Sequence, residues 1–169
     1  GREDAQLAMD SVAGHADGIS AEGDFYLKDA ILWGGNLSVL VTQLGTPYFP
    51  QIQGGILFLE DVGEHPYRIE RMLTQLLYSG VLARQKAVVL GQFTEFTTVP
   101  HDGRFRLATV VAWLRSQLKV PVLTNLPFGH VQTKVLLPVG AAVELALQGR
   151  EALMVWGHVG HIGHGEQGS

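Results

Sequence analysis

The stretch that decides the fold is Gly55-Ile-Leu-Phe-Leu-Glu-Asp-Val-Gly-Glu-His-Pro-Tyr-Arg-Ile-Glu-Arg-Met-Leu73. Its four apolar residues, 56–59, show no polar alternation, which indicates a strand buried on both faces. Pro66 suits the first position of a helix, and the apolar residues after it recur at helical spacing up to Gly80. The stretch therefore predicts a buried strand, a loop and an amphipathic helix, with Glu60 at the end of the strand, where α/β folds place functional groups.

Strands and helices alternate on both sides of this stretch. A short strand is predicted at 30–33 and a tight turn at 33–37, which feeds a helix that Asn36 caps. Further along the chain, the pattern predicts strands at 87–90 and 120–124 and a helix at 105–118. The last third changes to short strands at 134–138, 142–147 and 152–156, joined by glycines as in hairpins. The predicted fold class is α/β with a terminal β-meander.

Composition limits the class of protein and its organisation. The 169 residues suffice for one domain with a hydrophobic core; 46% are apolar and 17% charged, which argues against general disorder. A net charge of −4 provides no basic surface for nucleic acid, and no apolar run is long enough for a membrane span. The absence of cysteine excludes a thiol nucleophile and fits a cytoplasmic protein. We expect a linker-like extension at 1–28, a folded domain at 29–156 and a disordered Gly/His-rich tail at 157–169.

Two residues could carry acid–base chemistry. Glu60 has a structural and a functional interpretation. It either caps the following helix or forms an ion pair with Arg68 or Arg71, or it orients a catalytic histidine. His130 follows a Pro-Phe-Gly turn after the strand at 120–124 and, taken alone, is an ordinary loop histidine. Because each residue ends a predicted core strand, the two could meet at one edge of the sheet. A carboxylate beside an imidazole is the orienter and base of a nucleophilic triad.

A nucleophile to accompany this pair is not evident. No serine stands on a sharp turn between a strand and a helix with small neighbours. Ser38 comes nearest, but it falls in the first turn of a predicted helix, where its hydroxyl is expected to bond the backbone. The three histidines of the tail, His158, His161 and His164, are separated by glycines that break any helix, so we expect no metal site there.

The segment from Trp33 through Gly34 and Gly35 to Asn36 has two readings. An aromatic ring, a flexible Gly-Gly and an amide can hold a peptide substrate; alternatively, Trp33 belongs to the core and Asn36 only caps the helix. Arg68 also has two readings. It could bind a substrate carboxylate in bidentate fashion, or it could pair with Glu64 at i and i+4.

Several of these motifs, in this order, resemble the C-terminal half of the LD-carboxypeptidases, the murein tetrapeptide carboxypeptidase family of serine peptidases. The similarity runs from about residue 29 to 156. The motifs that carry it are Gly34–Ser38, Leu44–Tyr48, Ile56–Val62, Pro66–Leu73 and Phe128–His130.

The resemblance implies a two-domain enzyme of which this chain is one part. An N-terminal α/β domain of the family carries the nucleophilic serine, and a C-terminal domain of swivelling β/α character carries a glutamate and a histidine. The resemblance therefore implies that Glu60 is the triad acid and His130 the triad base. No segment here matches the family's Gly-Tyr-Ser-Asp type nucleophile motif. We expect the N-terminal domain to be missing and the chain alone to be inactive.

The activity implied by the resemblance is removal of terminal D-alanine from murein tetrapeptides in cytoplasmic peptidoglycan recycling. It implies no metal or organic cofactor, no nucleic-acid or membrane partner, and a homodimer. Two alternatives stay open. One is a serine peptidase like the microcin-immunity proteins, which cleave aminoacyl or peptidyl nucleotide conjugates. The other is a non-catalytic binding or oligomerisation module.

Overall fold

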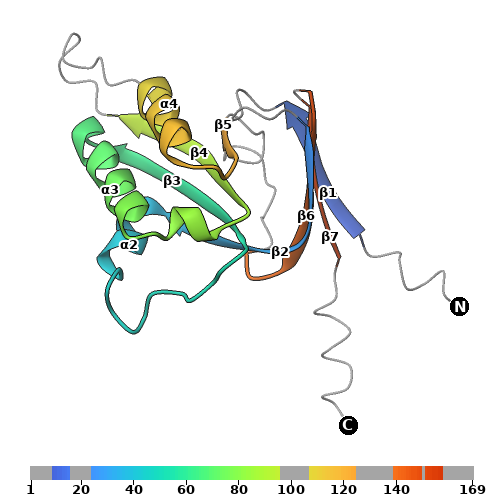
Figure 1. The fold of residues 1–169 in the computed structure, drawn as a ribbon, viewed down its shortest axis with the longest axis horizontal. Coiled ribbons are helices and arrows are strands. Elements are labelled where there is room, and N and C mark those ends of the chain that lie inside the picture. The colour runs from blue at the N-terminus through green and yellow to red at the C-terminus, as the bar shows by residue number, and fades with distance from the viewer. Residues whose placement is uncertain (1–8, 16–23, 96–106, 125–138, 150, 158–169) are drawn as a thin grey trace, which may run out of the picture.

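A computed structural model describes residues 9–15, 24–95, 107–124, 139–149 and 151–157 (Figure 1). Within these ranges, seven strands form one sheet in the order β1-β7-β6-β2-β3-β4-β5. The strands are β1 (Met9–His15), β2 (Phe25–Asn36), β3 (Ile56–Glu64), β4 (Ala87–Glu95), β5 (Val122–Thr124), β6 (Ala142–Gln148) and β7 (Glu151–Gly157). The helices are α2 (Leu37–Thr42), α3 (Pro66–Tyr78), the 3-10 helix η1 (Leu82–Arg84) and α4 (Leu107–Gln117). The predicted α/β fold that ends in a β-meander is confirmed.

Strand β2 joins two halves of the sheet. Its first half pairs antiparallel with β6, and its second half, from Leu32 to Asn36, pairs parallel with β3. The ladder with β6 shifts register between Leu27 and Ala30, where Asp29 has a positive φ of 56°. The three α-helices lie on one side of the parallel strands, and β1, β6 and β7 stand at an angle to those strands (Figure 1).

Both faces of the parallel strands are buried, as the lack of polar alternation in β3 predicted. Leu57 and Leu59 pack with the helices, whereas Ile56 and Phe58 pack with β6 and β7 on the other face. Successive side chains of a strand point to opposite faces. The next two residues of β3, which are both acids, are therefore directed to different sides of the sheet.

Several predicted elements differ from the structure in length. Strand β2 begins at Phe25 and includes both glycines at 34–35, which were expected to form a turn. Strand β3 continues to Glu64, so Glu60 lies within it rather than at its end; the β3–β4 ladder shifts register just before Asp61 and then resumes. These strands extend because their partners offer backbone hydrogen bonds beyond the apolar residues that mark them in the sequence.

The N-terminal and C-terminal regions also differ from expectation. The segment Met9–His15, expected to be linker, forms strand β1 and pairs antiparallel with β7. Strand β7 lies more than a hundred residues further along the chain, so no pattern in the sequence near 9–15 predicts the pairing. The predicted strand at 134–138 and the tail from 158 onward lie outside the described residues. No helix of the described part is long and apolar enough to cross a membrane.

Candidate active site

The site is built on the junction between β2, β3 and α2. The β2–β3 ladder ends with Asn36 opposite Glu60, and β2 passes directly into α2 at this point. Gly34 makes the close pairing possible. It has a φ of +115°, and a Cβ there would lie 2.2 Å from the carbonyl oxygen of Phe58. A side chain at position 34 would therefore push the two strands apart.

Glu60 lies on the face of β3 that is opposite the helices. Burial raises the pKa of its half-buried carboxyl, and the neighbouring charge of Asp61 raises this pKa further. No group in the described part of the chain donates a hydrogen bond to this carboxylate. A cationic imidazolium would relieve this unfavourable environment, because an opposite charge favours the ionised acid.

His130, the predicted triad base, lies outside the described residues, so its distance to Glu60 is not part of the structure. Its pairing with Glu60 stays a prediction.

Asp61, unlike Glu60, is buried and accepts several hydrogen bonds, and it was not identified from the sequence. It is 4% exposed and accepts hydrogen bonds from the backbone N–H groups of Ser38, at 3.1 Å, and Val62, at 3.0 Å. The hydroxyl of Ser38 donates to Asp61 Oδ2 at 2.5 Å, and Asn36 Nδ2 lies 3.5 Å from Oδ1. The signal that could have identified Asp61 is an acid at a position whose strand neighbours, two and four residues back, are core leucines. The expectation that the Ser38 hydroxyl bonds the backbone was wrong, because this hydroxyl donates to the carboxylate of Asp61.

Trp33 belongs mainly to the core. It is 3% exposed, its indole N–H donates to Gln85 Oε1 at 3.1 Å, and its ring meets Phe49 edge-on with centroids 6.0 Å apart. Asn36 caps α2 as predicted, since its Oδ1 accepts from the N–H of Val39 at 2.9 Å. Gly35, with a φ of +130°, would place a Cβ in open space.

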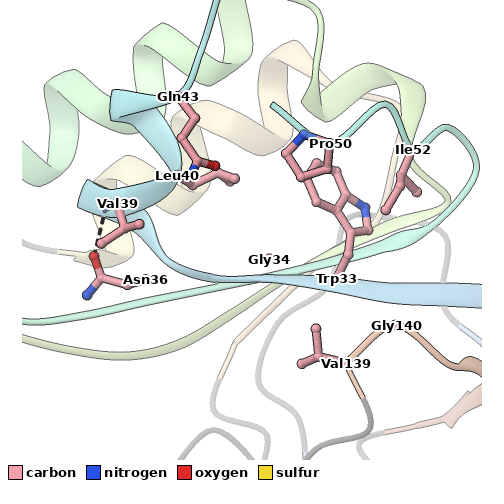
Figure 2. Close-up of a pocket in the computed structure, with 10 residues that line it drawn as sticks. All are labelled: Trp33, Gly34, Asn36, Val39, Leu40, Gln43, Pro50, Ile52, Val139 and Gly140. Atoms are coloured by element: carbon pink, nitrogen blue, oxygen red, sulfur yellow. Dashed lines mark hydrogen bonds between the residues drawn. The ribbon is translucent and has the colours of Figure 1, made fainter. Parts of the chain in front are cut away.

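A cavity of about 390 Å³ lies at the edge of β2 (Figure 2). It is mostly apolar and brings together three of the predicted substrate-binding residues. In Figure 2, Pro50 and Ile52 lie on one side of the β2 ribbon and Val139 and Gly140 on the other. The lining residues are Trp33, Gly34, Asn36, Val39, Leu40, Gln43, Pro50, Ile52, Val139 and Gly140.

Gln85 holds one wall of this cavity in place, and no sequence signal identifies it. The amide is 6% exposed, and its oxygen accepts from Trp33 Nε1 and from the N–H of Gly55, both at 3.1 Å. Its nitrogen donates to the carbonyls of Ile52, at 3.1 Å, and Val81, at 3.0 Å. All four bonding positions of the buried amide are thus used.

Arg68 lies apart from the cavity. Its Nε is 3.0 Å from Glu64 Oε1, the i,i+4 pairing that was one of its two readings. It borders a second depression, of about 240 Å³, whose lining shares no residue with the first. The other residues of that lining come from α2 and α3: Ser38, Val41, Thr42, Arg71, Met72 and Gln75.

Comparison with known proteins agrees with this architecture. The family model described as the LD-carboxypeptidase C-terminal domain matches residues 29–145. The murein tetrapeptide carboxypeptidase of Pseudomonas aeruginosa is 34% identical over 132 residues, which cover 75% of this chain and 38% of that protein. The chain spans half or less of the length of the curated relatives it matches.

Solved structures extend the comparison. The crystal structure of muramoyltetrapeptide carboxypeptidase from Oxalobacter formigenes has a TM-score of 0.75 and 44% identity, covering 92% of this chain and 53% of that one. The microcin C7 self-immunity protein MccF has a TM-score of 0.59 and 22% identity, covering 86% and 40%, which is a likeness of fold alone. The match over residues 29–145 and these relatives place the chain in the LD-carboxypeptidase family, as its C-terminal domain.

Proposed function

We propose that this chain is the C-terminal domain of a serine-type LD-carboxypeptidase that removes terminal D-alanine from murein tetrapeptides. In this proposal Glu60 and His130 are the acid and base of a Ser-Glu-His triad, and the serine comes from an N-terminal domain. The observation that carries the proposal is the environment of Glu60. It stands on the last rung of the β2–β3 ladder, half-buried, with a raised pKa and no hydrogen-bond donor within the described ranges.

The proposed reaction gives each residue a defined part. His130 takes the proton of the serine hydroxyl as its oxygen attacks the terminal peptide carbonyl. Glu60 holds the imidazole in the required tautomer and stabilises the imidazolium. His130 then gives the proton to the leaving amine of D-alanine, and water releases the acyl group from the serine by the same steps. The raised pKa of Glu60 supports this role, because the carboxylate gains most from a cationic partner.

Substrate-binding roles belong to the proposal as well. Gly34 and Asn36 border the apolar cavity and can contact a peptide there, with Gly35 next to them on β2. The nearly enclosed Trp33 would act in substrate binding as the support of the cavity wall. Arg68, whose Nε pairs with Glu64, would bind a substrate carboxylate through its terminal guanidinium nitrogens. We further propose a cytoplasmic homodimer that acts in peptidoglycan recycling and an isolated chain without activity. The similarity to the Pseudomonas murein tetrapeptide carboxypeptidase supports the role in murein turnover, and the half-length coverage supports the inactivity of the isolated chain.

The test is D-alanine release from a murein tetrapeptide by the full-length protein. Glu60→Gln and His130→Ala should each lower kcat/KM by at least about a hundredfold. The matched control is Glu70→Gln, which changes an exposed acid on α3 and should leave activity within about twofold of wild type. This chain alone should release no D-alanine, and mixing it with a separately produced N-terminal half should restore release. Full activity in Glu60→Gln would overturn the assignment of the acid.

The same assay separates the two alternatives. Cleavage of an aminoacyl nucleotide, with no cleavage of the tetrapeptide, would favour the microcin-immunity reading. Trp33 argues against it, because its ring is almost entirely enclosed and its N–H is taken by Gln85. A full-length protein that cleaves neither substrate would favour a binding module.

A further inference from the structure

Asp61 links three elements through one buried carboxylate. One oxygen accepts from the backbone and the hydroxyl of Ser38, at the start of α2. The other accepts from the N–H of Val62, on β3, and lies 3.5 Å from the amide of Asn36, at the end of β2. Hydrogen bonds to a charged acceptor are stronger than those between neutral groups, and a buried charge left without them is costly. Movement of the β2–α2 junction away from β3 would therefore take hydrogen bonds from a buried charge, which is unfavourable.

The linkage meets the candidate active site directly. Asp61 is the residue after Glu60, and its contact Asn36 stands opposite Glu60 in the β2–β3 ladder. The two acids are directed to opposite faces of the sheet, so Asp61 can hold the strands on the helix side without occupying the side of Glu60. Asn36 also caps α2 and lines the apolar cavity.

An outer pair continues the same network towards solvent. Ser38 Oγ lies 3.3 Å from Glu64 Oε2, and Glu64 in turn pairs with Arg68. The Arg68 side chain is 59% exposed, so this outer pair contributes little by itself. The buried bonds of Asp61 are the part that can fix the junction.

We propose that Asp61 is a positioning residue: it clamps the β2–α2 junction to β3 and thereby fixes the Asn36–Glu60 rung and the adjoining cavity wall. The consequence for catalysis rests on the function proposed above. The clamp itself rests on the hydrogen bonds of the described residues. The negative charge of Asp61 also acts on the carboxyl of Glu60, which provides a second means to observe the same residue.

The first test uses NMR on this chain with Asp61→Asn and a matched control, Glu64→Gln. The asparagine keeps the shape of the side chain. Both oxygens of Asp61 face donor groups, so the NH2 group of the asparagine must replace one of these acceptors and lose its hydrogen bonds. Amide exchange of Ser38 should accelerate at least about tenfold in Asp61→Asn and stay within about twofold in Glu64→Gln. The Glu60 carboxyl should titrate at lower pH in Asp61→Asn and at an unchanged pH in Glu64→Gln. Unchanged Ser38 exchange in a folded Asp61→Asn variant would overturn the clamp.

A milder variant covers the case in which Asp61→Asn does not fold. Ser38→Ala removes the hydroxyl donor but keeps the charge of Asp61 and the backbone N–H bond. Exchange at position 38 should then accelerate several-fold, while the Glu60 titration stays where it is. Exchange as slow as in the wild type would show that the junction is held by other contacts.

The second test measures kcat and KM of the full-length protein on the murein tetrapeptide. If the wild type is active, Asp61→Asn should lower kcat by about tenfold or more, whereas Glu70→Gln, the exposed acid on α3, should stay near wild type. Wild-type kcat and KM in an active Asp61→Asn enzyme would overturn the positioning role. A wild type that releases no D-alanine would refute the proposed function, and the NMR result would still decide whether Asp61 is a clamp.

Discussion

Replacing Gly34 by alanine tests how closely β2 approaches β3 beside the candidate site. The new Cβ would lie 2.2 Å from the carbonyl oxygen of Phe58 and 2.7 Å from Leu57 Cδ1. The oxygen belongs to the backbone of a central strand, so the strands would have to separate by about 1 Å to restore ordinary contact. The positive φ costs about 1–3 kcal/mol for a residue with a Cβ, and overpacking costs about 1–3 kcal/mol more. We expect a loss of about 2–6 kcal/mol, a large share of a domain's stability.

Gly35 provides the matched control, because it has a similar φ of +130° but no atom within 4 Å of its ideal Cβ. Gly35→Ala should therefore lose only the conformational part, about 1–3 kcal/mol. Urea denaturation followed by circular dichroism measures both variants, with equal m-values as the condition for comparison. Gly34→Ala should be less stable than Gly35→Ala by at least about 1 kcal/mol. Equal losses would refute the argument that the approach of the strands requires glycine at position 34.

Three further predictions follow from buried or paired groups. The folded protein binds the proton of Glu60 more tightly than the unfolded chain, so its contribution to stability falls as pH rises from the ordinary pKa of 4.5 through the raised value. Glu60→Gln should therefore gain stability relative to wild type between pH 4 and pH 7 in thermal melts; a constant difference would contradict this. Gln85→Leu removes the hydrogen-bond partner of Trp33 Nε1 and of the Gly55 N–H, and it takes one hydrogen bond from each of the carbonyls of Ile52 and Val81. The variant should lose at least about 3 kcal/mol in urea denaturation, and a loss below about 1 kcal/mol would contradict this role of Gln85. Arg68→Ala breaks an exposed pair with Glu64 and should change stability by no more than about 0.5 kcal/mol in the same assay, with or without salt.

Local signals in the sequence predicted several elements correctly. Pro66 is the first residue of α3, as predicted. The N–H groups in the first turn of a helix have no acceptor within the helix, so a proline, which has no N–H, loses no hydrogen bond there. Asn36 caps α2 through the short-range bond for which its side chain is suited. The unbroken apolar run at 56–59 indicated a strand covered on both faces. For the proline and the asparagine, the deciding contact lies within a few residues of the signal; for the apolar run, the signal is the absence of polar side chains on either face of the strand.

Long-range pairing decided what these signals could not. The extension of β2 depends on β6 along one half of the strand and β3 along the other, and the strand at 9–15 depends on the edge of β7. The closing of Trp33 into the core depends on Gln85, fifty-two residues away in the chain.

The adjacent acids of β3, Glu60 and Asp61, show most clearly which properties the sequence determines and which depend on the tertiary structure. The sequence by itself determined that two carboxylates follow a buried apolar run and that Glu60 lies in a motif that resembles the LD-carboxypeptidases. Only the tertiary structure decided their environments. Helix α2 covers one face of β3 and presents the N–H and hydroxyl of Ser38 to Asp61, whereas Glu60 is directed to the opposite face, where no described group donates to it. The physical reason is that strand geometry sends neighbouring side chains to opposite faces, and only the packing of distant elements determines what each face meets.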